Sequence, residues 1–199
     1  MLFRKQSWLI LVAAAALLSA VACGNFGKVE QGRAVAFDKQ NGVVTLILDS
    51  APQSEPRYDV LPPVKVKVPR DPNEMGAPPE PGRMLYNDFE KHRIVIFDPE
   101  AVAIKTVSYT VVERFDKVTR DDPRVAKAKF PRVDRQKKTV TVYSRRYKIL
   151  ITFAVPDEYL ALPDITWKAG DEIRYYYKQP GQALRMMNVS KTDMSKAGK

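Results

Sequence analysis

Two stretches of the chain share one pattern: "FDKQNGVVTLILD" at residues 37–49 and "VDRQKKTVTVYSR" at residues 133–145. An ungapped alignment at an offset of 96 residues pairs Asp38, Lys39, Gln40, Val44 and Thr45 with Asp134, Arg135, Gln136, Val140 and Thr141. In each stretch, polar residues that suit a tight turn precede an alternating, β-branched run. The pattern therefore predicts the same β-hairpin twice.

The segments after the two hairpins are also similar. "VKVKVP" ends at Pro69 and "ILITFAVP" ends at Pro156, and a short acidic stretch follows each proline. Gly82 and Gly170 then stand 13 and 14 residues beyond those prolines, each before a further strand-like run. This order favours an internal duplication, although short hairpins can also resemble one another by chance.

Strand-like patterns dominate the rest of the chain. "HRIVIF", "KTVSYTVV" and "EIRYYYK" are short, β-branched or aromatic runs bounded by turn residues. Nine prolines between residues 52 and 81 exclude a long helix there. The Gly-Asp entry of "WKAGDEIRYYY" is similar to strand entries of OB-like and SH3-like barrels. We predict an all-β protein of two tandem small OB-like or SH3-like β-barrel units related by the repeat, with little helix apart from a signal peptide.

The predicted organisation follows from these patterns and from composition. It comprises a lipoprotein signal peptide at 1–22, a tether at 23–32, β unit 1 at 33–119, a charged linker at 120–128, β unit 2 at 129–190 and a flexible tail at 191–199.

The N-terminal segment has the layout of a secretory signal peptide. Arg4 and Lys5 precede an apolar run of 14 residues from Trp8 to Val21, shorter than the roughly 20 residues that span a bilayer. The run leads into Ala20-Val21-Ala22-Cys23, which resembles the lipobox of bacterial lipoproteins. The alternative is an ordinary signal peptide cut near Ala22.

The resemblance implies a lipid on Cys23, the only cysteine of the chain. Cleavage before Cys23 would leave 177 residues and lower the net charge from +10 to +8, because residues 1–22 hold two basic and no acidic side chains. The exported part would contain no disulfide. Gly24 and Asn25 follow the cysteine, with no aspartate; we expect a periplasm-facing protein of the cell envelope, in the outer rather than the inner membrane.

Residues that would support catalysis are sparse. His92 is the only histidine, and no phosphate-binding loop, nucleophile elbow or zinc-ligand spacing is visible. Acidic pairs occur at 121–122, 157–158 and 171–172, in turn-like contexts. We therefore predict no catalytic residues, no metal and no cofactor. The alternative is an envelope hydrolase that acts on glycan or peptide through a carboxylate pair.

Basic and aromatic residues suggest a binding face. In "EIRYYYK", every second side chain would face water if Ile173, Tyr175 and Tyr177 face the core. The predicted face comprises Arg145, Arg146, Lys148, Arg174, Tyr176, Lys178 and Arg185, provided that their strands are neighbours. The expected partners are an anionic envelope polymer, a lipid headgroup or an acidic protein, and not nucleic acid. Alternatively, these charges only keep a sheet face soluble and block edge pairing.

The lipobox, "YDVLPPVKVKVP" and "WKAGDEIRYYYKQPGQALRMMNVSKTD" together resemble an uncharacterised family of small lipoproteins from sulfate-reducing bacteria, a domain of unknown function. The resemblance brings no activity and no site residues. The sequence thus predicts a lipid-anchored envelope protein that serves as a non-catalytic binding or scaffolding module, and it leaves the oligomeric state open.

Overall fold

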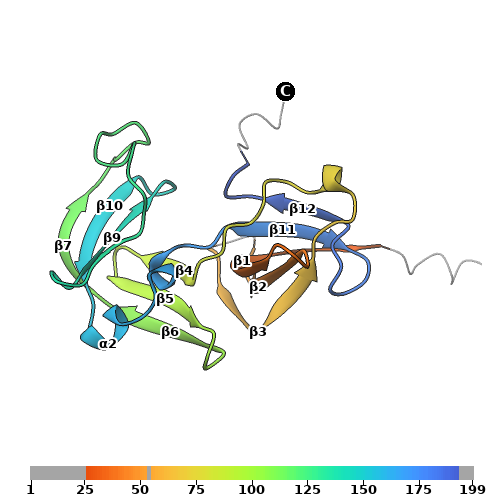
Figure 1. Cartoon of the computed structure of the whole chain (residues 1–199), viewed down its shortest axis with the longest axis horizontal. Helices are drawn as coiled ribbons and strands as arrows, with labels where there is room; N and C mark the ends of the chain where they lie inside the picture. Colours follow the sequence, from red (N-terminus) through yellow and green to blue (C-terminus); the bar gives the residue numbers. More distant parts are fainter. Residues whose placement is uncertain (1–25, 53–54, 193–199) are drawn as a thin grey trace, which may run out of the picture.

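The computed structural model describes residues 26–52 and 55–192 (Figure 1). Its strands are β1 (Lys28–Asp38), β2 (Val43–Asp49), β3 (Tyr58–Lys67), β4 (Met84–Asp88), β5 (Arg93–Asp98), β6 (Ala103–Ser108), β7 (Thr110–Phe115), β8 (Arg132–Asp134), β9 (Thr139–Ser144), β10 (Ile149–Ala154), β11 (Glu172–Tyr177) and β12 (Arg185–Asn188). Three short helical segments accompany them: η1 (Pro72–Glu74), α2 (Asp157–Leu160) and η2 (Asp164–Trp167). The predicted β-rich class is confirmed.

The strands form three antiparallel sheets. Their orders are β12-β11-β1-β2-β3, β7-β10-β9-β8 and β4-β5-β6. None of the three is closed into a barrel by its strand pairs, so the predicted pair of OB-like or SH3-like barrels is not confirmed. The five-stranded sheet curls furthest, since an isolated bridge joins Lys67 at the end of β3 to Gln182 beyond β11.

The two predicted hairpins, β1–β2 and β8–β9, have the same turn. Asp38 Oδ1 accepts hydrogen bonds from the backbone N–H groups two and three residues later, and Asp134 Oδ1 does the same at distances of 2.9–3.1 Å. Both loops end on a residue with positive φ, Gly42 at 61° and Lys138 at 57°. The register is also equal, because Asp38 faces Val43 and Asp134 faces the equivalent Thr139.

This turn occurs at two further places that the alignment missed. Asp88 and Asp98 each accept hydrogen bonds from the N–H groups two and three residues later. Their loops end at His92 and Val102, with φ of 50° and 48°. The repeating unit is therefore the aspartate-headed four-residue turn, whose shared hydrogen bonds come from backbone N–H groups, so the loop side chains can differ. In the β1–β2 turn the Asn41 side chain also donates to Asp38 Oδ2 at 2.7 Å.

The hydrophobic residues gather into two lobes (Figure 1). The terminal lobe, residues 26–81 and 170–192, contains β1–β3, β11 and β12 around a core that includes Leu46, Val66 and Ile173. The central lobe, residues 83–168, contains β4–β10 around a core that includes Ile96, Phe153 and Trp167. The central lobe is continuous in sequence, and the terminal lobe unites both ends of the described chain.

This arrangement combines strands from both predicted units. Each unit begins with a hairpin, a third strand, a short helical stretch, a glycine and two more strands, and unit 1 continues with β6 and β7. However, β11 pairs with β1 and β12 rather than with β8–β10, while β4 and β5 pack on β9 and β10. The sheets therefore do not follow the predicted boundary at 120–128, and residues 28–32 of the predicted tether belong to β1.

Gly82 and Gly170 lie where the two segments that connect the lobes cross. They allow strands of the two predicted units to combine in one lobe. Gly82 N–H donates to Ala34 O at 3.1 Å, and Ala34 N–H donates to Asp171 O at 2.9 Å. A Cβ on Gly82 would lie 2.2 Å from Lys168 O, and a Cβ on Gly170 would lie 2.0 Å from Ala34 O. Any side chain here would overlap with backbone, so the crossing requires glycine on both segments.

Contacts between the lobes combine a hydrophobic cluster with polar contacts, among them the ion pair of Lys168 Nζ with Glu80 Oε2 at 2.9 Å. Val35, Ile47 and Tyr58 of the terminal lobe pack with Leu85 and Phe97 of the central lobe. Arg33 lies beside this cluster; it donates to Gly170 O at 2.8 Å and to Tyr58 Oη at 3.1 Å. Burial raises the pKa of Tyr58 to about 12, an effect that Arg33 opposes.

Candidate functional site

The seven residues of the predicted basic face lie in two different lobes. Arg174 and Tyr176 belong to β11, Lys178 follows it, and Arg185 begins β12. Residues 145, 146 and 148 lie in the turn between β9 and β10, in another sheet. The neighbours of β11 are β1 and β12, because the C-terminal strands complete the terminal lobe. Hence neighbouring strands do not join the two groups into one face, and each group is considered separately.

The first group, the central basic cluster, consists of Lys117, Arg145, Arg146 and Lys148. All four side chains are exposed. The β9–β10 turn is tied to the segment after β7 because Val118 N–H donates to Lys148 O at 2.8 Å. Lys117 is thereby held beside the turn, although sequence spacing gives no sign of this.

Aromatic side chains support this cluster. The Arg146 guanidinium lies 5.7 Å from the centroid of the Tyr147 ring, and that ring meets Phe89 edge-on at 5.5 Å. Tyr143 Oη donates to Val118 O at 3.1 Å. The turn is therefore packed onto the lobe, while its cations point into solvent.

The cluster is part of a longer basic segment. Residues 117–148 hold 12 Lys or Arg and only three acidic residues, and all 12 basic side chains are exposed. Only three of the 12 form an ion pair with a described carboxylate: Arg124 with Asp122, Arg135 with Asp164 and Lys138 with Asp157. This segment therefore presents a large excess of unneutralised positive charge.

Two of these arginines also cover aromatic rings. The Arg124 guanidinium lies 4.3 Å from the centroid of Phe115, and that of Arg132 lies 4.9 Å from the centroid of Phe130. Phe115 and Phe130 pack with Val118, Val125 and Leu150 on the sheet. Both arginines lie within or next to the loop between β7 and β8, where a strand-based search finds no pattern.

The second group lies on the terminal face, defined as Val29, Gln31, Arg174, Tyr176, Lys178, Arg185 and Met187. Antiparallel register aligns Arg185, Tyr176 and Val29 across β12, β11 and β1, and Met187, Arg174 and Gln31 in the next row. The alternation predicted for β11 is confirmed, since Ile173, Tyr175 and Tyr177 are buried. The central lobe packs on this sheet at Val35 and Ile47, but not on the half that carries the terminal face.

Polar contacts fix parts of the terminal face. Arg174 Nε donates to Gln31 Oε1 at 2.9 Å, and Arg185 pairs with Glu74. No described carboxylate forms an ion pair with Lys28, Arg174 or Lys178, so these three cations are not neutralised by the described part of the chain.

On the opposite side of β11, a carboxylate joins two phenols. Tyr175 Oη and Tyr177 Oη donate to the two oxygens of Glu30 at 2.5 and 2.8 Å. Burial and these hydrogen bonds raise the pKa of both tyrosines, which remain neutral at ordinary pH. The arrangement fixes β1 on β11 and leaves Glu30 engaged with the phenols.

The residues considered for catalysis are scattered. His92 is exposed in the β4–β5 turn, rather than within a strand. Asp122 pairs with Arg124, which lowers the pKa of Asp122 to about 2, and Asp157 pairs with Lys138. Asp171 accepts from Asn188 at 2.7 Å beside the lobe crossing. Among the described residues, no three His, Cys, Asp or Glu side chains converge as metal ligands would.

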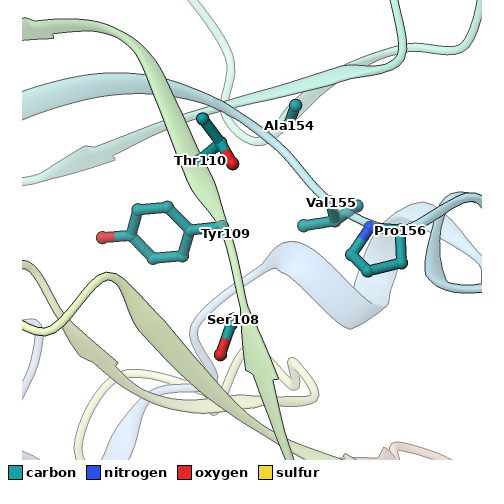
Figure 2. Close-up of a pocket in the computed structure, with 6 residues that line it drawn as sticks. All are labelled: Ser108, Tyr109, Thr110, Ala154, Val155 and Pro156. Carbon is teal, nitrogen blue, oxygen red and sulfur yellow. The ribbon is translucent and has the colours of Figure 1, made fainter.

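A shallow depression lies between β6–β7 and the end of β10 (Figure 2). Its volume is about 330 Å³, and it is lined by Ser108, Tyr109, Thr110, Ala154, Val155 and Pro156. No histidine or carboxylate lines it, and the Tyr109 hydroxyl donates to Asn87 Oδ1 at 3.1 Å. The depression thus offers no convergent acid and base.

The two lobes define a β protein with basic and aromatic surfaces and no convergent catalytic groups in the described residues. The chain belongs to the family of the domain of unknown function DUF4881, whose model matches residues 25–197. Neither the comparison with curated proteins nor that with solved structures gave a match. Family membership confirms the expected domain of unknown function; the lipid anchor and the sulfate-reducing origin stay predictions.

No helix in the described residues is long and apolar enough to cross a membrane. The predicted signal peptide and Cys23 lie outside the described residues.

Proposed function

We propose that the protein is a lipid-anchored, periplasm-facing component of the bacterial cell envelope, in the outer rather than the inner membrane. It serves as a non-catalytic module that binds an anionic partner. The observation that carries the binding role is the exposed basic segment 117–148, in which nine of 12 cations have no described acidic partner.

The central lobe suits such a role by its position. In Figure 1, the start of β1 lies at the end of the terminal lobe that is remote from the central lobe. A chain anchored at Cys23 would therefore present the central lobe away from its point of attachment. This geometry favours an anionic polymer or an acidic protein over the protein's own membrane as the partner of the central basic cluster.

The binding role is tested with a charge-neutralised variant of the mature chain. We expect replacement of Lys117, Arg145, Arg146 and Lys148 by glutamine to weaken binding to polyphosphate and polyglutamate at least about tenfold, a loss of roughly 1.4 kcal/mol. Exposed cations near an anionic surface contribute about 1 kcal/mol each. Titration at low salt measures the loss, and raising the salt should weaken wild-type binding as the Debye length shortens to about 8 Å.

The matched control removes four exposed cations from the terminal lobe: Lys39, Lys65, Lys67 and Arg70. If both variants lose affinity equally, net charge rather than the central basic cluster determines binding. Binding that survives the first variant and high salt would contradict the proposal.

The anchor is tested separately at Cys23. The intact mass of the membrane-extracted protein should show a diacylglyceryl thioether on Cys23, because a thiolate is the nucleophile that such a modification needs. Cys23→Ser should leave the signal peptide uncleaved and the chain unmodified. An unmodified thiol at the mature N-terminus would refute lipid anchoring.

A further inference from the structure

The proposed lipid on Cys23 bears on what covers the terminal face, the partly exposed side of the five-stranded sheet. Two residues, Gly24 and Asn25, lie between Cys23 and Phe26, the first described residue. Even fully extended, the three residue steps from Cys23 to Phe26 span only about 10 Å. A lipid on Cys23 therefore holds the beginning of β1 close to the membrane surface.

The side chains at this end of the sheet are unusual for a surface exposed to water. Phe26 is 91% exposed and Val29 is 62% exposed. Val29 faces Tyr176 across the β1–β11 ladder, and Met187 of β12 is exposed one row further along the sheet. Apolar residues at this density mark a surface that contacts something other than water.

The charges around these apolar residues fit an anionic surface. Arg174 and Lys178 flank Tyr176 on the same face of β11. Lys28 begins β1 next to the attachment point, but it is paired with Tyr177 and therefore belongs to the other face of the sheet. None of the three forms an ion pair with a described carboxylate. Tyrosine with an apolar ring and a polar hydroxyl is suited to the headgroup region, and long basic side chains extend toward lipid phosphates.

The tyrosine is held in place by the backbone beneath it. An ideal Cβ on Gly27 would lie 2.2 Å from the Tyr176 ring, so the ring rests directly on the segment that leads to the anchor. Leu184 N–H also donates to Tyr176 O at 2.8 Å. The face is thus preorganised beside the attachment point.

We infer that the terminal face lies against the anionic headgroups of the leaflet in which Cys23 is anchored, and fixes the orientation of the whole protein. Phe26, Val29, Tyr176 and Met187 insert among the headgroups, while Arg174 and Lys178 bind lipid phosphates. The inference rests on the proposed anchor, but not on the partner of the central basic cluster.

The test uses the mature, lipidated chain in vesicles of phosphatidylethanolamine and phosphatidylglycerol. A water-soluble amine-reactive reagent labels exposed lysines, and mass spectrometry compares the vesicle-bound protein with a soluble form of the chain that begins at Gly24 and carries no lipid. We expect Lys178 to lose labelling on the vesicles, while Lys117 and Lys148 keep it. Equal labelling of all three lysines, or protection of Lys117 and Lys148 alone, would overturn the orientation.

A second measurement uses tryptophan as a depth probe. Tyr176→Trp should lose emission when brominated phosphatidylglycerol is included, and the control Tyr147→Trp should not. Wild-type Trp167 is fully buried and provides the common background. Quenching at position 147 that equals or exceeds that at position 176 would contradict the inference, and the lysine labelling decides the case if Tyr176→Trp does not fold.

Flotation and the N-terminal mass distinguish the two proposals. A chain that is not lipidated and does not float with the vesicles contradicts the anchor and the orientation together. A lipidated chain that floats without protection of Lys178 contradicts the orientation alone.

Discussion

The terminal and central lobes contain corresponding strands but unite them differently. In the terminal lobe, β11 joins β1 through a six-residue ladder, so five strands form one curled sheet. In the central lobe, the corresponding β4 and β5 remain in a separate sheet and meet β9 and β10 through side chains. In the terminal lobe, the strand that follows the glycine therefore pairs with the first hairpin; in the central lobe, β4 and β5 meet the hairpin by side-chain packing, and the backbone ladder is formed by β7 and β10 instead.

The difference shows that a repeated strand order does not decide which strands become neighbours. Strands from both predicted units contribute to each lobe, and the crossing at Gly82 and Gly170 ties the lobes together. We therefore expect the two lobes to unfold as one cooperative unit, and the following variants test that expectation.

The largest expected effect comes from two buried core positions, Leu46 in β2 and Ile96 in β5. Both side chains are essentially fully buried, one in each lobe. Replacing either with alanine should lower the free energy of unfolding by about 3 kcal/mol. Denaturant unfolding followed by fluorescence of Trp167 and by circular dichroism should show one coincident transition for each variant. A separate early transition confined to the mutated lobe would show that the two lobes unfold independently.

Gly170→Ala should destabilise by about 2 to 3 kcal/mol, because its Cβ would overlap with Ala34 O and force a backbone shift. Gly76→Ala is the matched control, since its Cβ would have no neighbour closer than 3.3 Å. Thermal unfolding measures both. If the two variants lose similar stability, tight packing at the crossing does not join the lobes.

Tyr58 allows a test of the lobe interface by pH. Its pKa of about 12 in the folded protein exceeds the ordinary value of 10.0, mainly because of burial. The stabilising contribution of the neutral phenol is fully present below pH 10 and is lost as pH rises through 12, at about 1.4 kcal/mol per unit of pKa difference.

Tyr58→Phe should therefore reduce the loss of stability between pH 10 and 12. Tyr109, whose pKa burial also raises to about 12, serves as the central-lobe comparison through Tyr109→Phe. Denaturant unfolding across this pH range measures the slopes. An unchanged slope for Tyr58→Phe would show that its phenol does not titrate on unfolding.

The smallest expected effects concern the shared turns. Gly42 and Val102 occupy the same positive-φ position in the β1–β2 and β5–β6 turns. Left-handed backbone costs a non-glycine residue about 1 to 2 kcal/mol, so Gly42→Val should destabilise and Val102→Gly should stabilise by about 1 kcal/mol. Changes in melting temperature of the same sign would contradict equivalence of the two turns.

Several features could be predicted from the sequence because they depend on residues close together. Asp38 and Asp134 head equivalent turns whose hydrogen bonds span only two or three residues. Burial of Tyr175 and exposure of Arg174 follow from the two-residue period of a strand. The turns at Asp88 and Asp98 escaped the alignment because they lack the Lys/Arg-Gln pair that follows Asp38 and Asp134.

Local sequence patterns were not sufficient to predict which residues meet at the candidate sites. Arg145 and Arg174 were expected on one face, yet they lie in different sheets because β11 completes the terminal lobe. Lys117 joins Arg145 and Lys148 through contacts between residues far apart in the chain, such as the hydrogen bond from Val118 to Lys148, which connects residues 30 apart.

The sequence by itself determined the β-rich class, the aspartate-headed turns, the alternation of β11 and the excess of basic residues, since each depends on composition or on short-range geometry. Only the tertiary structure decided the exchange of strands, the crossing of two glycine segments and the uncovered terminal face. The physical reason is that antiparallel strands of similar pattern can pair in several orders. The choice among them depends on burial and close backbone contacts between residues that are far apart in the chain, such as Ala34 and Gly170.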